Sequence, residues 1–164
     1  MQNKIRIMDY VYSSSVDGTG FRDVLFVNYC PHHCEGCHNP ESWDKANGHD
    51  ITIEEAYQNL TKSEITNVTF SGGEPFEQAE ALAILAKMLK AKGKTIWVYS
   101  GYTFEQLIKS PEKLKLLELC DVLVDGKFDI NQKGLNLRFK GSHNQRIIDI
   151  QKSLKLNKAV EANV

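Results

Sequence analysis

The stretch Val24-Leu25-Phe26-Val27-Asn28-Tyr29-Cys30-Pro31-His32-His33-Cys34-Glu35-Gly36-Cys37 joins a short apolar run to three closely spaced cysteines. The β-branched and aromatic side chains of residues 24–29 predict a buried strand that ends at the cysteine loop, residues 30–37. A cubic iron-sulfur cluster usually takes four cysteine ligands, so three would leave one iron with an open coordination position. The loop therefore predicts a site where a small molecule binds iron and reacts.

Two other interpretations of the cysteine loop are a disulfide framework and a structural zinc site. Residues 1–6 carry no apolar signal-peptide run, so we expect reduced thiols in a cytoplasmic protein. A zinc site would need a fourth ligand, for which the sequence offers four candidates. These are His32, His33, His38 and Cys120. The chain has no second pair of cysteines separated by two residues, which makes zinc the weaker alternative.

Length and charge limit the possible partners. The chain has 164 residues, which suits a single domain over residues 1–164. Lys and Arg number 20, Asp and Glu 21, and the net charge of -1 gives no broad attraction to nucleic acid or to an anionic membrane. No apolar stretch approaches the roughly 20 residues that cross a bilayer. We therefore expect neither nucleic acid nor membrane as a partner.

Three further apolar runs each end at a polar, glycine-bearing motif. Residues 67–70 precede Ser71-Gly72-Gly73-Glu74-Pro75, residues 95–99 precede Ser100-Gly101-Tyr102, and residues 121–124 precede Asp125-Gly126-Lys127. Helical patterns lie between the runs, at residues 53–60, 77–92 and 104–119, the last with a break at Pro111. Residues 135–139 predict a fifth strand, and residues 147–156 fit a strand or a helix.

The alternation of strand and helix predicts an α/β fold with mostly parallel strands joined by right-handed helical crossovers. Ligands gather at the carboxyl ends of such strands, so we expect all four motifs to face one mouth. A complete eight-unit barrel takes roughly 250 residues. This chain can therefore supply only an incomplete, open (β/α) barrel, whose open side would admit a bulky substrate.

Each motif has a functional and a plain interpretation. The Gly72-Gly73 pair would let a ligand approach the backbone while Glu74 accepts hydrogen bonds from an ammonium group, or the motif is an ordinary turn. Lys127 would meet a carboxylate at the mouth, or is a solvated loop residue. The remaining candidates have simpler interpretations. We interpret His32 and His33 as solvated loop residues, and Cys120 and Trp97 as buried residues. Arg22 belongs to a glycine turn and is also a candidate for binding an anion.

Taken together, the motifs resemble those of the radical S-adenosylmethionine superfamily and, within it, of the activating proteins of anaerobic, class III ribonucleoside-triphosphate reductases. The resemblance runs from about residue 5 to residue 150. The motifs that carry it are Asp17-Gly18-x-Gly20-Phe21-Arg22, Leu25-Phe26-Val27, the cysteine loop, Gly36-Cys37-His38-Asn39-Pro40-Glu41-Ser42-Trp43, Ser71-Gly72-Gly73-Glu74-Pro75, Tyr99-Ser100-Gly101-Tyr102, Val122-Leu123-Val124-Asp125-Gly126-Lys127-Phe128 and Gly141-Ser142-x-Asn144-Gln145-Arg146.

The resemblance implies an enzyme with two cofactors, a [4Fe-4S] cluster and S-adenosyl-L-methionine, and a protein substrate. The amino and carboxylate groups of S-adenosylmethionine would chelate the fourth iron. Reductive cleavage would then give a 5'-deoxyadenosyl radical that generates a glycyl radical on the large reductase subunit. The electron would come from a low-potential donor, which the resemblance does not identify.

Site residues follow from the same resemblance, which assigns no further catalytic residue. Cys30, Cys34 and Cys37 would hold the cluster. Gly36, Cys37 and His38 would lie along S-adenosylmethionine, Gly73 and Glu74 would hold its amino end, and Lys127 would lie near its carboxylate. Many superfamily members have an aromatic residue where this chain has Gly36, so His38 as the adenine neighbour is a hypothesis.

Two alternative functions stay open at the level of sequence. One is an activase of a different glycyl-radical enzyme, such as pyruvate formate-lyase, whose activases generally lack the Gly-Ser-x-Asn-Gln-Arg tail. The other is a non-catalytic iron-sulfur or zinc-binding module that binds metal without turnover.

Overall fold

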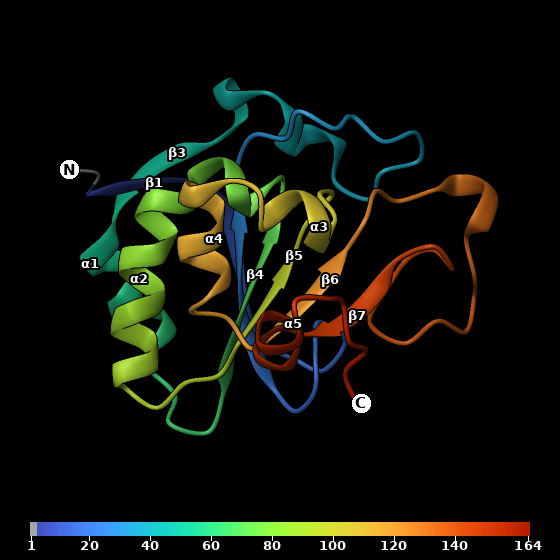
Figure 1. The fold of residues 1–164 in the computed structure, drawn as a ribbon. Coiled ribbons are helices and arrows are strands. Elements are labelled where there is room, and N and C mark those ends of the chain that lie inside the picture. The colour runs from blue at the N-terminus through green and yellow to red at the C-terminus, as the bar shows by residue number, and fades with distance from the viewer. Residues whose placement is uncertain (1–2) are drawn as a thin grey trace.

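A computed structural model describes residues 3–164, which form a mixed α/β fold around one seven-stranded sheet (Figure 1). The strands occur in the spatial order β3-β1-β2-β4-β5-β6-β7. They are β1 (Lys4–Ser14), β2 (Arg22–Val27), β3 (His49–Thr52), β4 (Asn67–Gly72), β5 (Ile96–Tyr99), β6 (Val122–Asp125) and β7 (Arg146–Asp149). The α-helices are α1 (Ile53–Leu60), α2 (Ala79–Ala91), α3 (Phe104–Leu107), α4 (Pro111–Leu117) and α5 (Ile150–Leu156). Short 3-10 helices are η1 (Pro40–Trp43), η2 (Lys45–Asn47), η3 (Pro75–Gln78) and η4 (Ile130–Gln132).

The four central strands confirm the predicted parallel core. β2, β4, β5 and β6 are parallel neighbours, and helices lie on the connections between β4, β5 and β6. Their carboxyl ends therefore meet at one edge, the upper edge in Figure 1, where the segment after β2 also lies. The predicted break in the third helix is confirmed as well, because α4 begins at Pro111 with Ser110 capping it through a bond from the N–H of Lys113.

The edges of the sheet differ from the prediction of mostly parallel strands. β1 pairs antiparallel with both β2 and β3, and β7 pairs antiparallel with β6, so three of the six neighbouring pairings are antiparallel. These edge strands lie outside the strand-helix repeat that the apolar runs revealed. β1 escaped detection because only its first half alternates buried and exposed residues, while residues 11–13 are exposed.

The predicted strand at residues 135–139 is wrong. Leu135 is 96% exposed, and Phe139 has a φ of 67°, a left-handed conformation that extended strands do not use. Phe139 instead packs its ring against Trp97, with ring centroids 5.1 Å apart. The ambiguous segment at residues 147–156 contains both elements, since β7 ends where α5 begins and Asp149 caps that helix.

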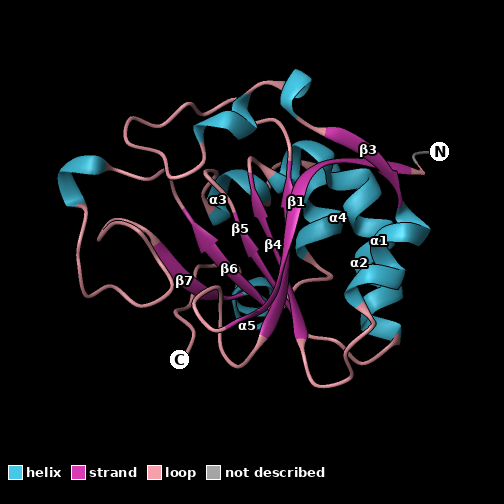
Figure 2. Cartoon of the chain, turned by 180° about the vertical axis from the view of Figure 1, so that it is seen from behind, coloured by secondary structure: helices cyan, strands magenta, loops and turns pink. Residues whose placement is uncertain are grey.

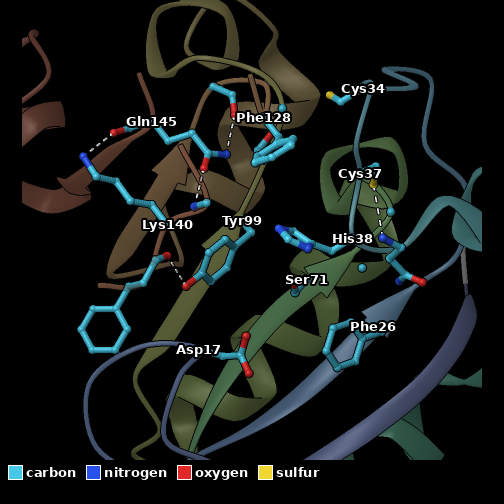
Figure 3. Close-up of a pocket in the computed structure, with 18 of the residues that line it drawn as sticks. Asp17, Phe26, Cys34, Cys37, His38, Ser71, Tyr99, Phe128, Lys140 and Gln145 are labelled. Carbon is cyan, nitrogen blue, oxygen red and sulfur yellow. Dashed lines mark hydrogen bonds between the residues drawn. The ribbon is translucent and has the colours of Figure 1, made fainter. Parts of the chain in front are cut away.

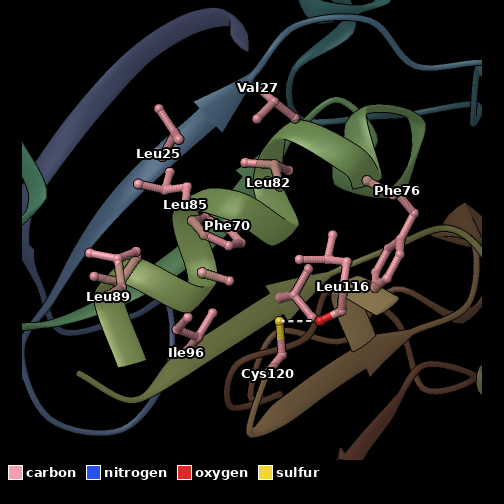
Figure 4. Packing of buried hydrophobic residues seen from close by; sticks show 14 of the residues in the cluster. Leu25, Val27, Phe70, Phe76, Leu82, Leu85, Leu89, Ile96, Leu116 and Cys120 are labelled. Carbon is pink, nitrogen blue, oxygen red and sulfur yellow. Dashed lines mark hydrogen bonds between the residues drawn. The ribbon is translucent and has the colours of Figure 1, made fainter. Parts of the chain in front are cut away.

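The main core lies between the sheet and the helices α1, α2 and α4, which cover one face (Figure 2). Leu25, Phe70, Val98 and Leu123 are register partners across the four parallel strands, and all are fully buried. The α2 side chains Leu82, Leu85 and Leu89 pack over this face, as Figure 4 shows. Each such side chain contributes about 1.5–3 kcal/mol through burial. This packing fixes the strand ends that carry the motifs.

The opposite face of the parallel strands carries the alternate residues, which is the period of two expected of a strand. Phe26, Ser71 and Tyr99 line a cavity there. Nearer the amino ends, Arg22 is 2% exposed and donates to the carbonyl oxygens of Val68 and Thr95, each 2.9 Å away. Its donors serve the chain itself, so the structure gives no support to an anion site at this residue. No helix in residues 3–164 is long and apolar enough to cross a membrane.

Candidate functional site

A cavity of about 680 Å³ opens at the carboxyl edge of the parallel strands. Its lining includes all three cysteines of the cysteine loop, and it also includes His38, Gly73 and Phe128. Figure 3 shows the Cys34 and Cys37 sulfurs on one side of the cavity and Tyr99 and Asp17 toward the opposite side. Of the residues predicted for the site, Gly36, Glu74 and Lys127 do not line it. The convergence of the strand-end motifs at one mouth is confirmed.

The cysteine loop holds three free, partly buried thiols. Burial raises the pKa of the Cys30 thiol to about 11. It also raises the pKa of Cys34, an effect that the N–H of Phe128 and the charge of Lys127 oppose. The loop closes through a turn in which the N–H of Cys37 donates to the oxygen of Cys34 at 3.1 Å. Because thiolates rather than thiols bind metal, loading this loop would release protons.

Single-ion metal sites are absent from the described chain. Within residues 3–164, no three His, Cys, Asp or Glu side chains are gathered around a point that could hold one metal ion. The proposed fourth zinc ligand Cys120 is fully buried in the core under the helices and bonds the oxygen of Leu116. It is absent from the cavity lining. The prediction that Cys120 is a buried apolar thiol is confirmed.

The structure explains why residue 36 is a glycine, which the sequence alone did not reveal. Its φ is 76°, which favours glycine, and a Cβ added there would lie 2.7 Å from Cδ1 of Ile130 and 3.3 Å from Cε2 of Phe128. A side chain at this position would have to displace the end of the Ile130 side chain and would press against the Phe128 ring. Phe128 instead brings an aromatic ring to the same part of the cavity, and its centroid lies 5.3 Å from that of the exposed His38.

The Gly72-Gly73 pair makes room for the chain's own backbone. A Cβ on Gly73 would lie 2.3 Å from the oxygen of Tyr29, and one on Gly72 would lie 2.5 Å from the nitrogen of Val27. A hydrogen bond joins the segment to that backbone, because the N–H of Glu74 donates to the carbonyl oxygen of Tyr29 at 2.8 Å. The glycines therefore press the end of β4 against the strand that leads into Cys30, while Gly73 still lines the cavity.

Glu74 lies differently from the sequence-based expectation of a carboxylate open to an ammonium group. The residue is 0% exposed, and both carboxylate oxygens accept hydrogen bonds from inside the protein. The donors are His32, Ser100, the N–H of Gly101 and the N–H of Phe76. Burial of a carboxylate requires such partners, which explains why the side chain turns inward.

The interpretation of His32 as a solvated loop residue is wrong. Its side chain is 6% exposed, and Nε2 lies 2.7 Å from Oε1 of Glu74. Its neighbour His33 fits the interpretation, since it is exposed and stacks on Trp43.

Lys127 is exposed and lies between two lining residues, Gly126 and Phe128, on a loop that the Gly-Ser-x-Asn-Gln-Arg segment holds in place. Asn144 donates to the oxygen of Lys127 at 2.8 Å, and Gln145 donates to the oxygen of Gly126 at 3.0 Å. Arg146 makes two bonds to the buried carboxylate of Asp125, at 3.0 and 2.5 Å. This tail motif therefore holds the wall of the cavity that carries Phe128.

Comparison with known proteins agrees with this geometry. Residues 16–148 match the family described as a 4Fe-4S single cluster domain, so the class of protein is a single-cluster iron-sulfur protein with a mixed α/β fold. More specifically, the chain belongs to the family of anaerobic ribonucleoside-triphosphate reductase-activating proteins. That family assignment confirms the resemblance drawn from the motifs.

Three relatives carry the family assignment, each named an anaerobic ribonucleoside-triphosphate reductase-activating protein. The protein of Enterobacteria phage T4 is 38% identical over 80% of this chain and 86% of its own length. The Vibrio cholerae protein is 37% identical over 80% of this chain and 90% of its own length. The Salmonella typhimurium protein is 34% identical over 86% of this chain and 96% of its own length. The crystal structure of QueE from Escherichia coli shares the fold, with a TM-score of 0.53 and 18% identity over 61% of this chain and 53% of QueE.

Several lining residues carried no sequence signal that singled them out. Phe128 and Asp17 occur in motifs that carry the family resemblance, but the resemblance assigns neither of them a role. Both line the cavity. The clue available for Phe128 was Gly36, because a missing aromatic residue in one loop invites a search for one in the loop that faces it.

Proposed function

We propose that this protein is a radical S-adenosylmethionine enzyme that activates an anaerobic ribonucleoside-triphosphate reductase by generating a glycyl radical on its large subunit. The observation that carries the proposal is the donor set of the cavity: three cysteine thiols line it, and the fourth cysteine is buried on the other face of the sheet. Three soft thiolate ligands suit an iron-sulfur cluster and leave one iron to an exogenous ligand.

Cys30, Cys34 and Cys37 would hold the cluster. When bound, the cluster would supply the electron that splits S-adenosylmethionine into methionine and a 5'-deoxyadenosyl radical able to take a hydrogen from a glycine Cα. The residues of the chain bind and orient. Loading of the half-buried thiols would require their deprotonation, which the charge of Lys127 beside Cys34 favours.

The cavity is large enough for a ligand the size of S-adenosylmethionine, since small-molecule sites range over about 300–1,000 Å³. We infer that Cys37, His38 and Gly73 lie along the cofactor, as they line the cavity. Phe128 adds an aromatic surface next to His38 that suits a purine ring. Gly36, Glu74 and Lys127 would act from behind or beside this lining, Gly36 by admitting Phe128 and Glu74 by supporting the cysteine loop.

The proposal extends to partners and location. The names of the relatives support an anaerobic ribonucleoside-triphosphate reductase as the partner, and we propose its large subunit as the protein substrate. A low-potential electron donor is required, and a cytoplasmic setting suits four free thiols. We further propose that residues 1–164 act as one radical S-adenosylmethionine domain.

The test mixes the iron-loaded protein with reductant, S-adenosylmethionine and the large reductase subunit, and records the electron paramagnetic resonance spectrum. A glycyl doublet on the reductase is expected. A parallel sample with pyruvate formate-lyase is expected to give none, and a doublet only in that sample would replace the proposed partner. A Cys34→Ala variant serves as the matched control and is expected to give no doublet with either partner.

A further inference from the structure

We propose that His32 is a positioning residue that ties the cysteine loop to the buried carboxylate of Glu74 and so holds Cys30 at the cavity wall. The importance of that loop rests on the proposed function. The tie, which is the hydrogen bond between His32 and Glu74, is a property of the protein chain, and its effect on Cys30 can be measured without iron.

The tie is one short hydrogen bond between two buried side chains. Nε2 of His32 lies 2.7 Å from Oε1 of Glu74, and the side chains are 6% and 0% exposed. A carboxylate oxygen only accepts, so Nε2 carries the proton and donates. Hydrogen bonds to an ionised group away from water are shorter and about twice as strong as neutral ones.

Glu74 joins three segments of the chain. Ser100 and Gly101, beyond the end of β5, donate to it at 2.9 and 2.8 Å, and the N–H of Phe76 donates at 3.0 Å. Among residues 3–164, His32 is its only donor from the cysteine loop. Removing His32 therefore leaves the carboxylate buried with backbone and hydroxyl donors alone.

The cysteine loop has few other attachments. Within the part of the chain that the structure describes, the bond from His32 is the only hydrogen bond that joins residues 30–33 to a distant segment. The carboxyl-terminal half of the loop has a separate attachment, because the N–H of Phe128 bonds the Cys34 sulfur. The remaining bonds are local, such as Cys37 to Cys34 and Asn39 to the Cys37 sulfur. Loss of the His32 bond would therefore free the amino-terminal half of the loop, where Cys30 lies.

The glycine opposite His32 is matched to its ring. A Cβ on Gly101 would lie 2.4 Å from Cδ2 of His32, and the ring packs edge-on against Tyr102 with centroids 4.6 Å apart. Gly101 does not have a positive φ, so its backbone conformation does not require glycine. The requirement comes from the histidine, which makes Gly101→Ala a second, independent way to displace the ring.

The test measures how fast iodoacetamide modifies Cys30 in the reduced, iron-free chain of residues 1–164, with peptide mass spectrometry as the readout. His32→Leu removes the donor and is expected to raise the rate about tenfold, the effect of losing one charge-assisted hydrogen bond. His32→Gln places an amide donor at the same reach and is expected to stay within about threefold of the unmodified protein. His33→Asn is the matched control, because His33 is exposed and does not contact Glu74; no change is expected.

Cys120 reports in the same experiment whether each variant is folded. This thiol is 0% exposed and should stay unmodified unless the core opens. If His32→Leu exposes Cys120, the His32→Gln and Gly101→Ala variants decide the question. Gly101→Ala is expected to raise the Cys30 rate about tenfold in the native background and to add nothing in a His32→Ala background, where the ring is gone.

The inference is overturned if Cys30 reacts at its native rate in His32→Leu and Gly101→Ala while Cys120 stays protected. It is also overturned if His32→Gln reacts as fast as His32→Leu, because ring packing would then be responsible. The test separates the tie from the proposed function. A chain that binds no cluster but shows the predicted Cys30 pattern would refute the function and leave the tie standing.

Discussion

Arg146 provides a prediction whose size can be worked out from the structure. Its guanidinium makes a two-point contact with Asp125, whose side chain is 1% exposed, and a second contact with Glu105, whose side chain is 53% exposed. Asp125 directly precedes the cavity loop with Lys127 and Phe128. Arg146→Met keeps an unbranched side chain that is shorter than that of arginine, and it removes both ion pairs.

The magnitude follows from what each carboxylate loses. Breaking a fully buried ion pair costs about 3–5 kcal/mol, because one charge stays buried without its partner. Asp125 keeps the N–H of Phe104 at 2.7 Å, and the Arg146 side chain is 35% exposed, so water can reach the site. We therefore expect Arg146→Met to lower the free energy of unfolding by about 2–3 kcal/mol. Glu105→Gln removes only an exposed pair and should cost less than about 1 kcal/mol.

Urea unfolding of the iron-free chain, followed by far-ultraviolet circular dichroism, measures both values from the shift in midpoint. Arg146→Lys is a useful intermediate, because it keeps the charge but cannot make the two-point contact. A loss in Arg146→Met no larger than in Glu105→Gln would refute the reasoning, since it would mean that the buried carboxylate contributes nothing beyond the exposed one.

Three further predictions follow from the same contacts. The hydrogen bond from Arg146 lowers the pKa of Glu105, so this pair should stabilise the fold above the ordinary Glu pKa and lose its contribution as the pH falls through the lowered value. When the pH is lowered from 7 to 3, the urea midpoint should therefore decrease less steeply in Glu105→Gln than in the native protein. Gly36→Ala should lower the iron bound per chain and destabilise the fold by about 1–2 kcal/mol, because the left-handed backbone and the contact with Ile130 both oppose a side chain. An iron count unchanged from the native protein would contradict this prediction. Cys120→Ala should destabilise the core by about 1 kcal/mol but leave the amount of bound iron unchanged, whereas Cys34→Ala should lose the cluster. Equal loss of iron in both variants would contradict the ligand assignment.

The parallel core was predictable because its signals are local. The runs at residues 67–70 and 121–124 are short and apolar and lead to a glycine, and they coincide with β4 and β6 to within one or two residues at their ends. The strand at residues 135–139 failed for a nonlocal reason, because Phe139 packs against Trp97 from a loop. Apolar side chains over a cavity and apolar side chains in a strand produce the same pattern.

The site was predictable in its chemistry and less so in its orientation. The spacing of the cysteines brought all three to one cavity, yet sequence could not reveal that Glu74 turns inward toward His32. That orientation depends on donors from three separate segments. A glycine in a sequence can make room either for a ligand or for the chain's own backbone. At Gly73 it makes room for the backbone of Tyr29, which is far away in the sequence.

The most direct test of the central claim is the product assay. Iron-loaded protein, reduced anaerobically with dithionite and mixed with S-adenosylmethionine, should release 5'-deoxyadenosine and methionine in equal amounts, and Cys34→Ala should release neither. A fully iron-loaded native protein that leaves S-adenosylmethionine intact, or a Cys34→Ala variant that still cleaves it, would contradict an iron left open by three cysteine ligands.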